Sequence, residues 1–160
     1  MTREQFIKHV GATQKAFRRF LVALCCGDAA TADDVAQEAY IKAYLSCGSI
    51  KSEEKFKTWL YRIGYNTFLN HMRGERITSG YDEARELPAQ ERSDKAFAYQ
   101  ELYAALNRLP PKERTSVLLY YMEGYSVKEI SAIEHASEDA VKAHLSRGRT
   151  HLRKFLSNGQ

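Results

Sequence analysis

Proline is absent from the first 87 residues of this 160-residue chain, because its three prolines fall at positions 88, 110 and 111. Apolar residues recur instead at helical spacing: Val141, Leu145, Gly148 and Leu152 follow one another at intervals of four, three and four. Strand signals, which are alternating apolar residues between glycine-rich turns, are missing. The sequence therefore predicts an all-α fold.

Residues 77–95 interrupt this helical pattern. They hold five acidic and three basic side chains, one proline and few apolar residues, a composition typical of a solvated, flexible linker. The stretches on either side, 1–76 and 96–160, are each long enough for a small helical core. We therefore expect two small helical domains joined by a linker.

Composition excludes several classes of protein. The longest apolar run, Phe20 to Cys26, is far shorter than the roughly twenty residues of a membrane-spanning helix. No signal peptide is recognisable at the N-terminus. Three cysteines without a C-x-x-C pair are typical of small buried residues in a reducing compartment, so we expect a cytoplasmic protein. These cysteines are Cys25, Cys26 and Cys47, and we place the first two inside a helix.

Sequence signals of catalysis and of cofactor binding are also missing. The five histidines have no metal-ligand spacing, and neither a phosphate-binding loop nor a nucleophile triad is present. We therefore expect no enzyme, no metal ion and no cofactor. The net charge of +4 permits a nucleic-acid partner without requiring one.

A helix-turn-helix is predicted in the C-terminal unit. Ser126 and Glu129 form a capping box, which opens a short helix of about eight residues to Glu134. After a tight turn at His135, Ser137 can cap a longer last helix. A short helix, a tight turn and a long helix make up this DNA-binding motif. The preceding helix is predicted to begin at Pro110-Pro111 and to end with a left-handed Gly124.

The last helix is strongly basic. Residues 140–160 hold five basic side chains and no acid, whereas residues 101–139 hold four basic and seven acidic ones. Such polarity suits DNA phosphates, although basic residues near the C-terminal dipole of an ordinary solvated helix would give the same excess. A stand-alone helix-turn-helix repressor or activator would need only this unit.

The N-terminal unit contains a helix with a mixed polar and aliphatic face. A capping box at Thr31 and Asp34 predicts a helix from Asp33 to about Leu45. Acid, amide and aliphatic groups on one face suit a protein interface, but a partly buried amphipathic face would have the same spacing. The residues of this face are Asp34, Gln37, Glu38, Ile41 and Leu45.

Residues 56–68 are rich in aromatic side chains. On a helical wheel, Tyr61 and Tyr65 lie opposite the predicted core residues Phe56 and Trp59. We expect the two tyrosines on an exposed face, where rings beside guanidinium groups can stack unpaired bases. The polar residues beside them are Arg62, Asn66, Asn70 and Arg73.

Taken together, these segments resemble the bacterial extracytoplasmic-function (group IV) sigma factors, which are promoter-recognition subunits of RNA polymerase. Residues 32–40 (ADDVAQEAY) resemble the family's A-E-D-L-V-Q-E-x-F helix, and residues 56–66 (FKTWLYRIGYN) resemble F-x-x-W-L-x-R-I-A-x-N. Residues 109–114 (LPPKER) and 123–130 (EGYSVKEI) resemble L-P-x-x-x-R and E-G-x-S-x-x-E-I-A. The order and spacing of the four stretches make the resemblance specific over nearly the whole chain.

The resemblance implies a sigma factor that binds core RNA polymerase, directs it to promoters and promotes DNA opening, without catalysis of its own. Residues 1–76 would be sigma region 2, residues 96–160 sigma region 4, and residues 77–95 the linker. The implied partners are the clamp helices and flap of the polymerase, promoter DNA and an anti-sigma factor, which could hold the chain at the inner membrane. No small-molecule substrate is implied.

The resemblance also implies three sets of site residues. The set that would bind the clamp helices is Asp34, Gln37, Glu38 and Ile41. The set that would capture a flipped base and bind the minus-ten element, in the loop 47–55 and the aromatic helix, is Ser49, Lys51, Lys55, Tyr61, Arg62, Tyr65, Asn66 and Arg73. The set that would bind the minus-thirty-five element is Ser137, Lys142, His144, Ser146, Arg147 and Arg149.

Two departures from the family pattern fall in the helix-turn-helix. His135 stands where the family has glycine, and histidine is among the residues that tolerate a positive φ. The last helix begins Asp139-Ala-Val-Lys142, where the family has Gly-Thr-Val-Lys, and Glu138 precedes it. Acids there favour the helix dipole but repel phosphate, unless one accepts a hydrogen bond from a cytosine amino group.

Overall fold

The computed structural model describes residues 1–78 and 94–157, and the side chains of residues 1–74 and 99–157. All regular secondary structure in these ranges is helical, as the sequence predicts. The predicted linker lies outside the described residues, except at its two ends, which belong to helices. No helix in the described ranges is long and apolar enough to cross a membrane.

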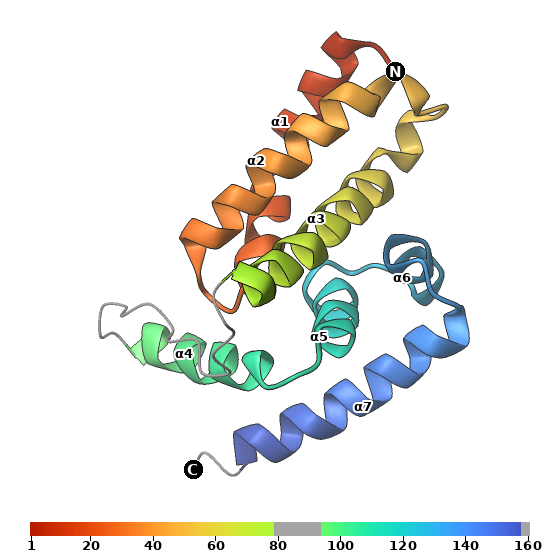
Figure 1. Cartoon of the computed structure of the whole chain (residues 1–160). Helices are drawn as coiled ribbons and strands as arrows, with labels where there is room; N and C mark the ends of the chain where they lie inside the picture. Colours follow the sequence, from red (N-terminus) through yellow and green to blue (C-terminus); the bar gives the residue numbers. More distant parts are fainter. Residues whose placement is uncertain (79–93, 158–160) are drawn as a thin grey trace.

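Three long helices form the N-terminal unit (Figure 1). Helix α2 packs against both of the others, so the unit is a three-helix bundle. Short 3-10 turns occupy the predicted polar loop between α2 and α3, at Cys47–Ser49 and Glu53–Lys55. The helices are α1 (Arg3–Leu24), α2 (Ala29–Ser46) and α3 (Phe56–Thr78).

Helix α2 begins four residues before its predicted start, so the capping box at Thr31 is wrong. The N-cap is Asp28, whose carboxylate accepts hydrogen bonds from the backbone N–H of Thr31 at 3.1 Å and from its hydroxyl at 2.7 Å. Left-handed residues at Cys26 (φ 55°) and Gly27 (φ 91°) end the preceding turn and let the next helix begin at once. Cys25 and Cys26 are buried as predicted, but at this turn rather than inside a helix.

Replacement of this cap should cost stability. We expect Asp28→Ala to lower the free energy of unfolding by about 0.5–2 kcal/mol, because it leaves the backbone N–H and the hydroxyl of Thr31 without their acceptor. Urea unfolding followed by circular dichroism measures the loss. Asp34→Ala, on the exposed side of the same helix, is the matched control and should change stability by less than about 0.5 kcal/mol. Equal effects of the two variants would contradict the assignment of the cap.

The C-terminal unit contains α4 (Asp94–Asn107), α5 (Pro111–Val117), a π-helical turn η3 (Leu118–Met122), α6 (Val127–Glu134) and α7 (Glu138–Ser157). In η3 the backbone N–H of Glu123 donates to the carbonyl of Leu118, five residues earlier, at 3.2 Å. Helices α6 and α7 form the predicted helix-turn-helix, and α5 packs against α7.

The local signals predicted for this unit are confirmed. Ser126 and Glu129 cap each other's backbone N–H groups at 3.1 and 3.0 Å. His135 is left-handed, with φ 54° and ψ 50°, and Gly124 has φ 75°. The hydroxyl of Ser137 accepts from the backbone N–H of Ala140 at 3.1 Å and caps α7.

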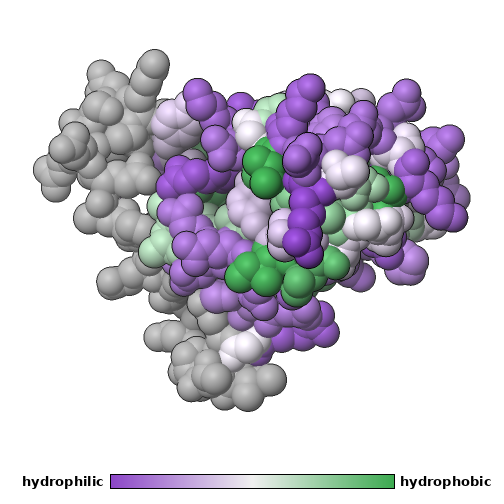
Figure 2. All heavy atoms as spheres, turned by 90° about the horizontal axis from the view of Figure 1, so that it is seen from above, coloured by the Kyte–Doolittle hydropathy of each residue, from purple (hydrophilic) through white to green (hydrophobic). Residues whose placement is uncertain are grey.

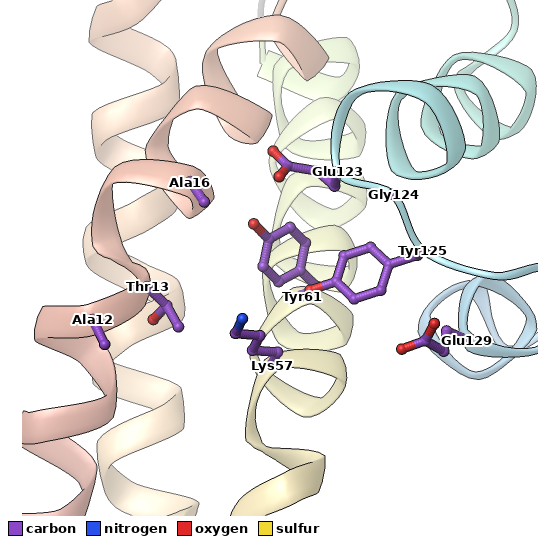
Figure 3. A pocket seen from close by; sticks show the side chains of 9 residues that line it. All are labelled: Ala12, Thr13, Ala16, Lys57, Tyr61, Glu123, Gly124, Tyr125 and Glu129. Carbon is purple, nitrogen blue, oxygen red and sulfur yellow. The ribbon is translucent and has the colours of Figure 1, made fainter.

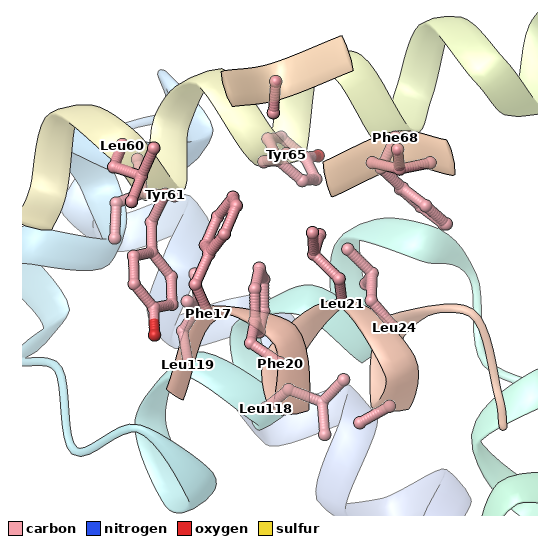
Figure 4. Close-up of a cluster of buried hydrophobic side chains, with 14 of the residues drawn as sticks. Phe17, Phe20, Leu21, Leu24, Leu60, Tyr61, Tyr65, Phe68, Leu118 and Leu119 are labelled. Atoms are coloured by element: carbon pink, nitrogen blue, oxygen red, sulfur yellow. The ribbon is translucent and has the colours of Figure 1, made fainter. Parts of the chain in front are cut away.

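One apolar cluster runs through both units (Figure 4). Phe17 and Phe20 of α1 are fully buried between α3 and the second unit, which contributes Leu118 and Leu119. Gly64 permits the close contact of α3 with α1, since a Cβ there would lie 2.6 Å from the ring of Phe17. The two units therefore pack against each other, with α1 facing η3 and α3 facing α6.

Candidate polymerase and nucleic-acid interfaces

The outward face of α2 carries the four residues predicted to bind polymerase. Asp34, Gln37 and Glu38 are all exposed. Ile41 is 62% exposed and Leu45, one turn further along, is 79% exposed. An aliphatic strip beside acid and amide groups is suited to contact with another protein. Figure 2 shows the end of the molecule at the top of Figure 1, where hydrophobic groups lie among mostly hydrophilic residues.

The loop after α2 and one side of α3 form a second polar surface. Ser49, Lys51 and Lys55 are exposed on the 3-10 turns and the residues between them. Three of the residues predicted on α3 are also exposed, namely Arg62, Asn66 and Arg73. The Arg73 guanidinium donates to the side-chain oxygen of Asn70 at 2.9 Å. Six of the eight residues predicted to bind the minus-ten element are therefore exposed on this loop and on α3.

Tyr61 and Tyr65 are the other two, and the prediction that they are exposed is wrong. Each is only 2% exposed. The Tyr61 ring lies 5.3 Å from Phe17, 5.1 Å from Phe20 and 5.1 Å from Tyr125 of the second unit. The helical wheel placed both tyrosines opposite the core, but α1 and the second unit cover that side of α3. Burial raises the pKa of Tyr65 to about 12.

An ion pair between an exposed guanidinium and a buried carboxylate joins the two units. The Arg19 guanidinium of α1 donates to Oε2 of Glu123 at 2.9 Å, and the Glu123 side chain is only 4% exposed. This carboxylate raises the pKa of Arg19. Beside the pair lies a cavity of about 270 Å³, lined by both units (Figure 3). The rings of Tyr61 and Tyr125 meet at its centre, and the Tyr61 hydroxyl points towards Glu123.

Arg114 is a structural residue to which the sequence assigned no role. Its buried guanidinium donates to four backbone carbonyls. Three belong to the end of α4 and the following turn, at 2.9, 3.5 and 3.1 Å for Leu106, Asn107 and Leu109. The fourth is Leu24 of α1, at 2.9 Å and 90 residues away in sequence. The one available signal was its position as the arginine of L-P-x-x-x-R.

The basic face of α7 is largely accessible. Lys142, Ser146 and Arg147 are exposed, and Ser137 lies exposed at the start of the helix. Arg147 lies 3.8 Å from a carboxylate oxygen of the buried Glu113. Arg149 is half-buried and donates to the Tyr121 hydroxyl at 2.9 Å.

His144 does not belong to this accessible face, and its prediction as a base contact is wrong for this arrangement. It is 9% exposed, because it follows the buried Val141 by three residues and so lies on the inner side of α7. Its ring faces Glu134 at the end of α6, with 4.0 Å between Nδ1 and Oε1. His151 likewise faces an acid, Glu113, at 2.7 Å. Sequence spacing could not identify either carboxylate as a partner.

The described residues contain no group of three or more histidine, cysteine, aspartate or glutamate side chains that could hold a metal ion. The accessible faces are instead a mixed face on α2, a polar face on α3 with its preceding loop, and a basic face on α7. They suit one protein partner and one nucleic-acid partner.

Comparison with known proteins assigns both units. Residues 10–77 match the family model "Sigma-70 region 2", and residues 99–152 match "Sigma-70, region 4". The chain is 35% identical over 144 residues to the RNA polymerase sigma-H factor of Pseudomonas aeruginosa, covering 81% of this chain and 75% of that protein. It is 33% identical over 145 residues to the ECF RNA polymerase sigma factor SigW of Bacillus subtilis, covering 81% and 78%.

Solved structures share the fold. The sigma factor RpoE of Bartonella quintana, solved in complex with the anti-sigma factor NepR, has a TM-score of 0.78 and 26% identity, over 95% of this chain and 96% of that one. CnrH, solved in complex with the cytosolic domain of CnrY, has a TM-score of 0.73 and 21% identity, over 97% and 89%. The likeness to CnrH is one of fold.

Proposed function

The chain belongs to the extracytoplasmic-function family of RNA polymerase sigma factors, and from this we propose that its three accessible faces divide the work of promoter-specific transcription initiation. The α2 face would bind core polymerase. The polar face of α3 and its loop would bind the minus-ten element, and α7 would bind the minus-thirty-five element. Residues 1–76 and 96–160 are then the two functional domains.

The observation that carries this proposal is the position of α7. It is the second helix of a capped helix-turn-helix, the arrangement that places such a helix in the major groove. Lys142 and Arg147 extend from it into solvent, where they can neutralise phosphates. The exposed acids Glu138 and Asp139 lie at its start and would repel phosphates. They would favour binding only where one of them accepts a hydrogen bond from a cytosine amino group in the major groove.

The α2 face supports the assignment to a protein partner. Ile41 and Leu45 expose aliphatic surface that contact with polymerase would bury. Basic side chains, which DNA would favour, are sparse there; Lys42 lies 3.5 Å from Glu38. The sequence offers no catalytic constellation, so the polymerase supplies the chemistry, and the protein acts in the cytoplasm with it.

An anti-sigma factor is the third partner we propose. The likeness to RpoE, solved with its anti-sigma factor, extends over 95% of this chain, and both units are therefore included. The two units pack against each other, an arrangement called closed from here on, and in it the second unit helps to cover Tyr61 and Tyr65 of α3. A partner that stabilises the closed form would withhold these rings from promoter DNA.

Paired substitutions test the division of labour. We expect Lys142→Ala with Arg147→Ala to weaken promoter binding by the holoenzyme and to reduce its salt slope by about 2, because each lost phosphate contact releases about one counterion fewer. Binding to core polymerase should be unchanged. Gln37→Ala with Glu38→Ala should weaken binding to core polymerase instead. Fluorescence anisotropy with labelled promoter and with labelled core polymerase measures the two affinities.

Lys154→Ala, an exposed basic residue in the last turns of α7, is a control for the general effect of lost positive charge. It should change promoter affinity less than the pair does. If both double variants weaken the same step, the proposed division of labour is wrong. If the wild-type protein itself does not bind core polymerase at micromolar concentration, the proposal fails as a whole.

A further inference from the structure

Two buried polar atoms without hydrogen-bond partners face each other inside the helix-turn-helix. Glu134 is the last residue of α6, and His144 lies in the second turn of α7. Their side chains are 2% and 11% exposed, and Oε1 of the glutamate lies 4.0 Å from Nδ1 of the histidine. Neither atom has a hydrogen-bond partner among the residues that the structure describes, and 4.0 Å is too long for a bond between them.

The second oxygen of Glu134 contacts α5, the helix that packs against this motif. Oε2 accepts a hydrogen bond from the Ser116 hydroxyl of α5 at 2.6 Å. One carboxylate on α6 therefore contacts α5 through Ser116 and faces α7 through His144. Such a group can set the position of α7 relative to the two helices that support it.

We propose that Glu134 is a positioning residue for promoter binding, which holds the recognition helix α7 in place through a single proton shared with His144. The inference rests on the proposed role of α7 in binding duplex DNA. Both partners are internal and neither needs to touch DNA.

Burial makes this carboxyl group able to hold a proton near neutral pH. Burial raises the pKa of Glu134 to about 7, against smaller opposing effects of the Ser116 hydrogen bond and of Lys112 on α5. Tyr65 of α3, in the other unit, also faces this carboxylate, and the negative charge of Glu134 helps to raise the pKa of the Tyr65 hydroxyl. A negative charge at Glu134 is therefore costly in the folded protein.

The imidazole is correspondingly a poor site for an isolated positive charge. Burial lowers the pKa of His144 most, and Arg147 of α7 and Lys112 of α5 lower it further, while Glu113 of α5 raises it. A carboxylate and an imidazole this close titrate as a pair, so the first proton taken up belongs to both groups. These, with Tyr65, are the charged and titratable groups that face the pair from α3, α5 and α7.

The shared proton favours a shorter contact. Without it, the neutral imidazole has one N–H, which either ring nitrogen can carry. With it, the pair can form an imidazolium–carboxylate bond in which both partners are charged, and such bonds are typically about 2.7–2.9 Å long; without it, a bond to Oε1 depends on the tautomer that carries the proton on Nδ1. Closing the gap would draw α7 against α6. The proton also removes a negative charge from beneath the basic face, so both effects favour phosphate binding.

The direction of the pH dependence follows from the raised pKa. Folding raises the pKa of Glu134 from 4.5 to about 7, so the folded protein holds the proton more tightly than the unfolded chain. The stabilisation is complete below pH 4.5 and is lost as the pH rises to about 7. DNA affinity should fall over the upper part of the same range.

Glu134→Gln imitates the protonated carboxyl, because its amide can donate to His144 while its oxygen accepts from Ser116. Mixed-sequence duplex DNA is a sufficient probe, since the phosphate interaction does not depend on sequence. We expect the full-length variant and wild type to bind equally at about pH 6. At about pH 8 the variant should bind more tightly, by about tenfold for each unit by which DNA binding raises the pKa of the pair.

Two further variants separate positioning from simple packing. Glu134→Leu is buried but has no donor, so we expect it to bind DNA more weakly than Glu134→Gln at both pH values. His151→Gln removes the other imidazole of α7, which pairs with Glu113, and should retain the wild-type pH difference. The inference is wrong if the DNA affinity of Glu134→Gln changes with pH in the same way as that of wild type. It is also wrong if Glu134→Leu binds DNA as tightly as Glu134→Gln.

Carbon NMR of the Glu134 carboxyl and the His144 ring in wild type provides a test that needs neither a variant nor DNA. The carboxyl signal should shift with a midpoint of about pH 7, and the His144 ring signal should respond to the same step. A carboxyl midpoint near 4.5, with no matching change at His144, would refute the shared proton. If the Lys142→Ala, Arg147→Ala double variant binds the promoter as tightly as wild type, the role of α7 is refuted, but the coupled titration of Glu134 and His144 can still be observed.

Discussion

Arg114→Met should lower the free energy of unfolding by about 3–5 kcal/mol. The substitution keeps an unbranched side chain in place but removes every donor from four backbone carbonyls, of which Leu24 belongs to the other unit. A buried carbonyl that loses its partner costs about 1–3 kcal/mol, and water that enters the site recovers part of the total. Urea unfolding of the full chain measures the loss.

The matched controls separate charge from geometry. Arg114→Lys retains the charge, but an ammonium group cannot reproduce the planar fork of the guanidinium, so we expect roughly half of the loss. Arg108→Met removes an exposed guanidinium that lies 4.0 Å from the Phe155 ring centroid and should cost about 1 kcal/mol or less. A loss from Arg114→Met no larger than that from Arg108→Met would contradict the bonding described for Arg114.

Tyr61→Ala should be nearly as damaging, with an expected loss of about 3–5 kcal/mol, because it removes a ring packed among Phe17, Phe20 and Tyr125. Tyr61→Phe keeps those ring contacts and should cost about 1 kcal/mol. Thermal and urea unfolding of the full chain measure both. A much larger loss for Tyr61→Ala than for Tyr61→Phe would show that the Tyr61 ring is packed in the core of the protein in solution.

Tyr120→Ala is the control for loss of an aromatic ring at the surface. Its ring is 40% exposed and lies 4.9 Å from that of Tyr121, so we expect a loss below about 1 kcal/mol. Should Tyr61→Ala prove as mild as Tyr120→Ala, the packing around Tyr61 would not hold in solution. Tyr125→Ala, which removes the contact from the second unit alone, should fall between the two.

The features predicted correctly from sequence are those that depend on neighbouring residues. The capping box at Ser126 and Glu129, the left-handed His135 and the cap at Ser137 each need only a few residues of chain, so local chemistry determines them. The start of α2 was wrong because two oxygen-bearing caps, Asp28 and Thr31, lie three residues apart. The left-handed turn just before Asp28 favours the earlier one.

The features that sequence could not predict depend on which surfaces meet. A helical wheel identifies opposite sides of α3, but it cannot show that a second unit covers the side with Tyr61 and Tyr65. The partners of Glu134 and of Arg114 lie on other helices or on the turn after α4, up to 90 residues away. The exposed α2 face was accessible to prediction because nothing in the described part of the chain packs over Gln37 or Glu38.

The contact between the two units at Arg19 and Glu123 depends on the number of residues in the π-helical turn at Leu118–Met122. A π turn spans one residue more than an α turn, and each residue of a helix rotates its successors by about 100°. Deletion of one residue here would restore a regular α-helix and turn Glu123 about a quarter circle away from Arg19. The ion pair between the two units would then be lost. We therefore expect this contact between the units to be gained or lost during evolution by insertion or deletion of a residue in the turn, as well as by substitution of Arg19 or Glu123.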